Sequence, residues 1–167
     1  MRRGVFILLG LMLYWPVAGF AFTADKRDTL RGLTEISVLV EYLPDDVERE
    51  GLSREHLKRD IEVRLGQAGL RVLTLSEIAN SPGSPYLYVA VYQIKPPSVN
   101  SNAYAIGVAL KQLVHLSRNP PTEFFATTWE GAALPGSLSA PNVHDIRARI
   151  FDAVGRFIID YQAMNLK

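Results

Sequence analysis

Two long alternating segments, residues 86–95 and 103–116, constrain the fold of this chain more than any other feature. The first reads YLYVAVYQIK and the second reads AYAIGVALKQLVHL. Side chains of a strand point alternately to opposite faces, so alternation over this length predicts β-strands. Pro96 and Pro97 end the first segment, and residues 98–102 (SVNSN) form a loop. We therefore predict a long antiparallel hairpin.

The remaining elements follow from periodicity and from start and stop signals. Ser53 is suited to cap a helix that Gly69 ends, and Asn142 is suited to cap a long C-terminal helix. Residues 45–51 are expected to form a charged connection. The predicted elements, besides the hairpin and the two helices, are strands at residues 35–43, 70–74 and 123–131. This order indicates an α+β fold, a two-layer sandwich with a mostly antiparallel sheet of about five strands and two helices on one face.

A hairpin centred near Val99 would pair Tyr88 with Leu110 and Tyr92 with Ile106, which divides the sheet into two faces. One face would collect the residues Tyr86, Tyr88, Tyr92, Tyr104, Ile106, Leu110, Phe125 and Trp129. The other would collect Leu87, Val89, Val91, Ala105, Gly107, Ala109, Leu113 and Ala126. Alanine and glycine permit close approach, so we expect the helices on the second face. A slip of one residue would mix the two sets.

The first of these faces is the candidate interaction face of the protein. Tyrosine and tryptophan combine a large apolar area with a polar tip, and both are enriched at interfaces. The face would therefore suit docking of a protein or of an apolar ligand. The alternative is that the N-terminal lead and the loops at 96–102 and 132–141 shield it, because aromatic ladders also stabilise sheets by cross-strand pairing.

The N-terminus has the features of a secretory signal peptide. Arg2 and Arg3 precede an apolar run over residues 5–15, and small residues follow near Ala21. The run is shorter than the roughly 20 residues that a membrane span needs. We expect cleavage after Ala21, which leaves residues 22–167 as a single domain. No cysteine follows the run, so we expect a bacterial periplasmic or secreted protein without a lipid anchor.

Composition and motifs argue against several functions. Removal of the two arginines of the signal peptide leaves 18 − 2 = 16 basic against 17 acidic residues, which does not suit nucleic acid or an anionic membrane. His56, His115 and His144 lack metal-ligand spacing, and the acids of residues 45–50 lack the calcium-loop pattern. We find no nucleophile motif and no phosphate-binding loop. The sequence therefore predicts no cofactor, no metal and no enzymatic activity.

Three stretches carry a resemblance to known proteins: LKQLVHLSRNP, FFATTWEG and RARIFDAVGRFIIDYQAMN. They resemble a group of small exported bacterial proteins of unknown function. In architecture the chain is similar to periplasmic envelope-assembly modules, such as the lipopolysaccharide-assembly lipoprotein LptE and the N-terminal domain of the Tol-system protein TolB. The resemblance implies no active-site residues. Unlike LptE, the chain has no cysteine to carry a lipid.

These observations together predict a non-enzymatic periplasmic protein that docks a protein partner, or a second copy, through the Tyr- and Trp-rich sheet face. A role in cell-envelope assembly is the expectation from the resemblance. The alternative is a carrier of a small apolar or lipid-like ligand.

Overall fold

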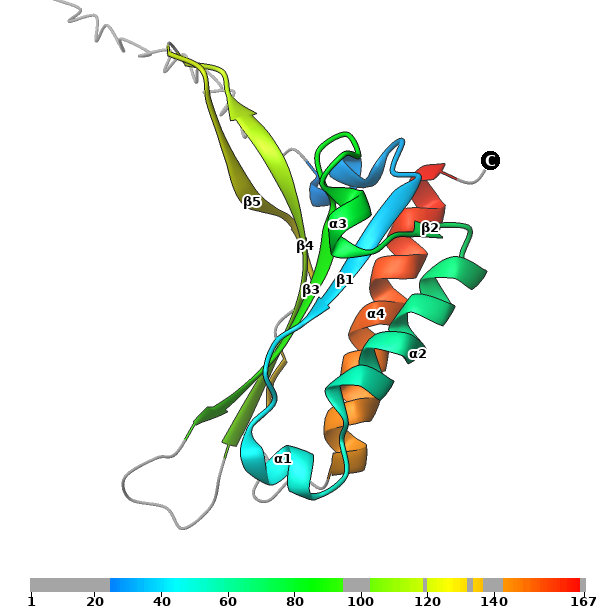
Figure 1. Cartoon of the computed structure of the whole chain (residues 1–167), viewed down its shortest axis with the longest axis vertical. Coiled ribbons are helices and arrows are strands. Elements are labelled where there is room, and N and C mark those ends of the chain that lie inside the picture. Colours follow the sequence, from blue (N-terminus) through cyan, green and yellow to red (C-terminus); the bar gives the residue numbers. More distant parts are fainter. Residues whose placement is uncertain (1–24, 95–102, 119, 132–133, 137–142, 166–167) are drawn as a thin grey trace, which may run out of the picture.

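One mixed β-sheet forms the centre of the computed structural model, which describes residues 25–94, 103–118, 120–131, 134–136 and 143–165 (Figure 1). Its strands are β1 (Glu35–Val40), β2 (Arg71–Val72), β3 (Tyr86–Ile94), β4 (Ala103–Leu116), β5 (Thr122–Glu130) and β6 (Leu134–Gly136). They lie in the order β2-β1-β3-β4-β5, and β6 also pairs with β4. β1 runs parallel to β2 and β3, whereas β4 pairs antiparallel with β3, β5 and β6. The α+β fold is as predicted.

Two long helices, α2 (Arg54–Gln67) and α4 (Val143–Asn165), pack against the same face of the sheet (Figure 1). This face buries aliphatic side chains of β1 and β3 and the helical side chains that meet them. The fully buried members include Ile36, Val38, Leu87, Val89, Leu110, Leu57, Ile61, Leu65, Ile146, Ile150, Val154 and Phe157. The buried residues of α4 recur at helical spacing and form one stripe along the helix. This layer is the core of the molecule.

The helix starts agree with local sequence signals, with one exception. The Ser53 hydroxyl accepts a hydrogen bond from the backbone N–H of His56 and caps α2, as predicted. The exception is the charged segment after Pro44, which was expected to be a connection and forms the short helix α1 (Asp45–Arg49). Val47 is buried there, so one apolar contact anchors an otherwise acidic helix. The predicted signal peptide and the cap residue Asn142 lie outside the described residues.

Two further short elements complete the described part. The 3-10 helix η1 (Lys26–Leu30) lies beside β5 and α4, and its Leu30 is fully buried. The one-turn helix α3 (Leu75–Ile78) begins with a capping box in which Thr74 and Glu77 satisfy each other's backbone N–H groups. These elements close one end of the layered structure.

The predicted hairpin register is wrong by one residue. Tyr88 lies opposite Ala109 rather than Leu110, and Tyr92 lies opposite Ala105 rather than Ile106. Because neighbouring side chains of a strand point to opposite faces, this shift moves every β4 residue to the other face relative to β3. The helix-covered face therefore combines the odd-numbered residues of β3 with the even-numbered residues of β4.

The correction separates the eight residues of the candidate face. Tyr104, Ile106, Leu110 and Trp129 lie on the helix-covered face, and all but the partly buried Ile106 are buried. Tyr86, Tyr88, Tyr92 and Phe125 lie on the opposite face. The helices also do not lie on the small-residue face, because Ala105, Gly107 and Ala109 share the face of the tyrosines. A register shift between Leu110 and Lys111 changes the pairing of β4 with β5 and places Trp129 and Phe125 on different faces.

Candidate functional site

The candidate site is the face of the sheet opposite α2 and α4. We call it the aromatic face and define it by Tyr86, Tyr88, Tyr92 and Phe125. Tyr92 is 53% exposed and Phe125 is 50% exposed as residues, whereas Tyr86 and Tyr88 are half-buried. Both long helices lie on the other side of the sheet (Figure 1). Neither long helix therefore lies over this face, and of the described helices only the short α3 packs on its β1 part, where Ser37 is buried.

Contacts between side chains hold the aromatic face in shape. The hydroxyl oxygens of Tyr88 and Tyr92 are 3.5 Å apart. The Lys111 ammonium lies 4.1 Å from the centre of the Tyr88 ring, a cation–π geometry. The Tyr86 and Phe125 rings are 5.7 Å apart and tilted by 59°. The rings are therefore ordered before any ligand binds, which lowers the entropic cost of binding.

Small residues of β4 make room for the tyrosine rings. A Cβ atom added at Gly107 would lie 3.9 Å from Cε2 of Tyr92, so the ring lies beside the bare glycine backbone. Ala90 and Ala109 are buried under the larger neighbours. Aromatic rings that cover a glycine in a neighbouring strand are a known means of stabilising sheets. The glycine and alanine residues thus serve the aromatic layer and not the approach of a helix.

The phenol groups of Tyr86 and Tyr88 stay neutral well above physiological pH. Burial raises the pKa of Tyr86. Burial is the main cause of the raised pKa of Tyr88. The hydroxyl of Tyr92 and the Glu41 carboxylate raise this pKa further. A neutral phenol can both donate and accept a hydrogen bond. The face therefore offers apolar rings with polar tips and suits a partner that presents apolar and hydrogen-bonding groups together.

Sequence reasoning missed two charged residues of this face. The Lys111 ammonium lies over the ring of Tyr88. The Glu41 carboxylate interacts with the Tyr88 hydroxyl and raises its pKa. The sequence did contain a signal for both residues. Glu41 and Lys111 are odd-numbered, and in β1 and β4 the odd-numbered side chains point to the aromatic face. Only the correct register connects that parity to the tyrosines.

The other four predicted face residues are structural. The Trp129 ring meets Phe157 of α4 edge-on at 5.1 Å, and its Nε1–H donates to Asp160 Oδ2 at 2.8 Å. The Tyr104 hydroxyl donates to the carboxylate of Asp46 in α1. Ile106 packs against the core and Leu110 is fully buried within it. These residues join the sheet to the helical layer.

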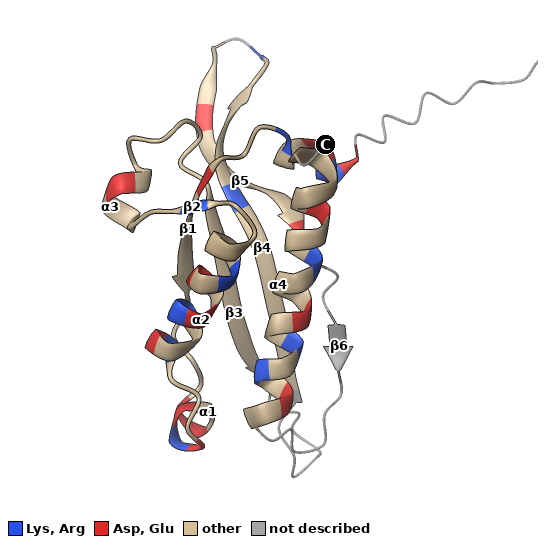
Figure 2. Ribbon diagram, turned by 90° about the vertical axis from the view of Figure 1, so that its right-hand side faces the viewer, with Lys and Arg blue, Asp and Glu red and all other residues tan. Residues whose placement is uncertain are grey.

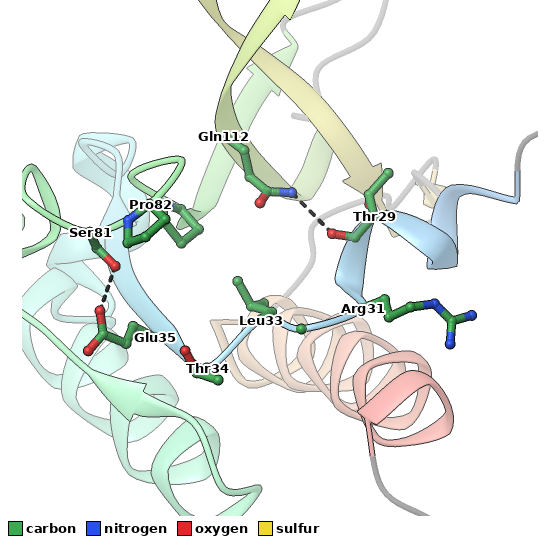
Figure 3. Close-up of a pocket in the computed structure, with 10 residues that line it drawn as sticks. Thr29, Arg31, Leu33, Thr34, Glu35, Ser81, Pro82 and Gln112 are labelled. Carbon is green, nitrogen blue, oxygen red and sulfur yellow. Dashed lines mark hydrogen bonds between the residues drawn. The ribbon is translucent and has the colours of Figure 1, made fainter.

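A polar hollow of about 260 Å³ lies between η1, the start of β1 and the loop before β3 (Figure 3). Its polar groups bond to one another. The Ser81 hydroxyl donates to Glu35, which also pairs with Arg71, and the Gln112 amide donates to the Thr29 carbonyl oxygen and to Thr128 Oγ1. Because these groups are satisfied and the lining is largely polar, the hollow does not suit an apolar ligand.

The three histidines do not meet in space. His56 and His144 are exposed in the first turns of α2 and α4. His115 pairs with Glu123 across β4 and β5, with Nε2 and Oε1 2.6 Å apart, and both side chains are more than half exposed. The described residues contain no group of three or more side chains placed to hold a metal ion.

Asp46 is the one acid of the charged segment with a structural contact to the sheet. It accepts hydrogen bonds from Tyr104 and from the Gln93 amide, the latter at 2.6 Å.

Over the described ranges, none of the helices has both the length and the apolar character of a membrane span.

Comparison with known proteins does not assign a family. No protein-family model and no curated protein matches the chain. Among solved structures, a neuraminyllactose-binding hemagglutinin homolog from Helicobacter pylori is similar over 79% of this chain and 83% of its own, with 7% identity and a TM-score of 0.28. A TM-score of this size does not establish a shared fold, so the function has to be argued from the aromatic face itself.

Proposed function

We propose that this protein is a non-enzymatic, exported bacterial protein that binds a protein partner through the aromatic face. The observation that supports the proposal most directly is the position of the two long helices. They cover one apolar face of the sheet and leave Tyr86, Tyr88, Tyr92 and Phe125 on the other. Aromatic side chains that share one face of a sheet and are partly exposed suit a binding surface, because each combines apolar area with access to solvent.

The chemistry of the face favours a protein partner over a lipid-like ligand. Rings with hydroxyl tips, a lysine ammonium over Tyr88 and the exposed carboxylate of Glu41 combine apolar contact with a polar rim. This combination is typical of protein–protein interfaces, in which Tyr is enriched at the centre and charged groups lie around it. A lipid carrier needs instead an enclosed and mainly apolar cavity. An activity in envelope assembly is part of the same proposal and rests on the predicted export.

Site-specific photocrosslinking in cells tests the proposal. A photoreactive residue at position 92 should give a discrete adduct, because Tyr92 lies in the proposed interface. The same residue at position 159 of α4 is the matched control, since Ile159 is 66% exposed but lies away from the sheet. The adduct at position 92 should disappear in the Phe125→Ala background. Equal labelling at the two positions would contradict the proposal.

A second measurement fixes the nature of the partner. With the purified partner, Tyr92→Ala should weaken binding by about tenfold or more, as for the loss of an aromatic anchor, and Ile159→Ala should leave it unchanged. An adduct of twice the chain mass would identify the partner as a second copy.

A further inference from the structure

The free edge of β5 is a second surface, which borders the aromatic face and shares Phe125 with it. β5 is the last strand of the sheet, and its side away from β4 has no strand partner within the described residues. The side chains of Glu123, Phe124, Phe125 and Thr127 are all exposed. An edge strand presents unpaired N–H and C=O groups, which are a template for pairing with another strand.

Only one end of this edge is protected. At the C-terminal end, η1 covers the backbone, because Thr29 Oγ1 donates to the Thr128 carbonyl oxygen at 3.2 Å and Lys26 Nζ donates to that of Glu130. Residues 122–127 have no such cover in the described structure. A stretch of six residues is as long as an average strand, so it is long enough to pair with another strand.

The usual devices against edge pairing are missing from residues 122–127. The stretch TEFFAT contains no proline and no lysine. Its one charge, Glu123, pairs with His115 of the same hairpin. The register shift in the β4–β5 pairing falls at Thr128, directly after the stretch, and Pro120 and Pro121 lie directly before it. Natural proteins prevent pairing at exposed edges with prolines, lysines and bulges. An edge without these features within it, and with Phe124 and Phe125 exposed, is suited to pair with another strand.

We propose that the β5 edge pairs antiparallel with the β5 edge of a second copy of this chain, which joins two sheets into one. Antiparallel identical strands are related by a twofold axis perpendicular to the sheet, and such a contact is closed. The axis would pass beside Phe124 or Phe125, at the middle of the free stretch. The aromatic face of one copy would then continue into that of the other.

The charges of β5 agree with this arrangement. Pairing about Phe124 or Phe125 places Glu123 opposite an uncharged residue of the other copy. Pairing about Phe125 places Pro120 opposite Glu130 of the second copy, and Arg118 lies in the same turn as Pro120. Neither Arg118 nor Glu130 has an ion-pair partner among the described residues, and the symmetry would form this pair twice. The β4–β5 hairpin extends away from the helices and is mostly uncharged, so the approach of a second sheet is unobstructed by α2 and α4 (Figures 1 and 2).

The mass in solution tests the proposal. Sedimentation equilibrium of the protein purified after export of the full chain, from about 1 to 100 μM, should show a reversible dimer. Phe124→Lys should raise the dimer dissociation constant by about tenfold or more, because a charged side chain on an edge strand opposes pairing. Ile159→Lys removes a comparable exposed apolar side chain from α4 and should leave the dimer intact. A wild-type monomer throughout this range would overturn the proposal, as would a dimer that Phe124→Lys does not weaken while circular dichroism shows a native fold.

Two further variants test the geometry. The chain has no cysteine, so a single introduced cysteine reports only its own contacts. Phe124→Cys or Phe125→Cys should form a disulfide-linked dimer on mild oxidation, and Ile159→Cys should not. Arg118→Glu and Glu130→Arg should each weaken the dimer, and the double exchange should restore it. Failure of all cysteine cross-links at 124 and 125 would overturn the strand pairing, whereas the partner experiment on Tyr92 would be unaffected.

Discussion

The two faces of strand β3 are both apolar, yet they have different roles. On the covered face, Leu87, Val89 and Val91 are buried beneath the helices. On the other, Tyr86 and Tyr88 are half-buried, and Tyr92 is exposed. Aliphatic side chains have no polar atoms to leave in contact with water, so helices can cover them without cost. The phenol hydroxyls need a hydrogen-bond partner or solvent, and they favour the open face.

The comparison shows how alternating apolar residues should be interpreted. Alternation identifies a strand, but two apolar faces leave open which of them is the core. Here the aliphatic face receives the helical layer, and the small residues of β4 lie under tyrosine rings on the other. The following predictions test this division, from the largest expected effect to the smallest.

Replacement of the buried Trp129 should cause the largest loss of stability. Trp129→Ala should lower the free energy of unfolding by about 3–5 kcal/mol, because it leaves a cavity against Phe157. Tyr92→Ala on the open face should cost less than about 1 kcal/mol, since over half of that side chain is already in water. Urea unfolding of both variants measures the difference. Similar losses for the two would mean that the faces are not distinguished by burial.

The hydrogen bond that ties Trp129 to α4 should contribute a smaller amount. Asp160→Ala leaves the indole N–H without its acceptor and should lower the free energy of unfolding by about 1–2 kcal/mol. Asp152→Ala on the same helix is the control, because Asp152 is exposed, and should change stability by less than about 0.5 kcal/mol. An equal effect of the two variants would show that the indole finds another partner.

The tyrosines of the open face should make stability fall at alkaline pH. The folded state raises the pKa of Tyr88, so folding favours the neutral phenol. This contribution is fully present below the unfolded-state pKa of about 10 and is lost as pH rises above it towards the higher folded-state pKa. Tyr88→Phe should therefore flatten the decline in urea midpoint above pH 10. A decline identical to that of the wild type would exclude Tyr88 as its source.

The smallest effect should come from Ser37, whose side chain lies on the same side of β1 as the tyrosines but is fully buried. Its hydroxyl has no hydrogen-bond partner in the described structure. Ser37→Ala removes an unsatisfied polar group and should be neutral or stabilising by up to about 1 kcal/mol. Thermal unfolding measures the shift. A loss of more than 1 kcal/mol would indicate that the hydroxyl is bonded in solution.

Much of the fold could be predicted because its signals are local. The Ser53 cap, the stop at Gly69 and the alternation over Tyr86–Ile94 each depend on neighbours in the sequence. Helix α1 was missed because the contacts of Val47 and Asp46 that anchor it are tertiary and the segment is otherwise charged. Half of the candidate face was misplaced for a similar reason. Leu110 faces the core because of the register between β3 and β4, which the hairpin loop sets. Trp129 faces the core because the β4–β5 register shifts between Leu110 and Lys111.

The sequence by itself determined that two long strands form a hairpin and that these strands are apolar on both sides. It also determined that one long helix follows the first strand and another follows the last. The tertiary structure decided which side the helices cover. The reason is the two-residue period of a strand, because a shift of one residue between neighbours exchanges the faces without changing any local preference. Local sequence therefore specified the strands, and only the packing of α2 and α4 distinguished the core from the aromatic face.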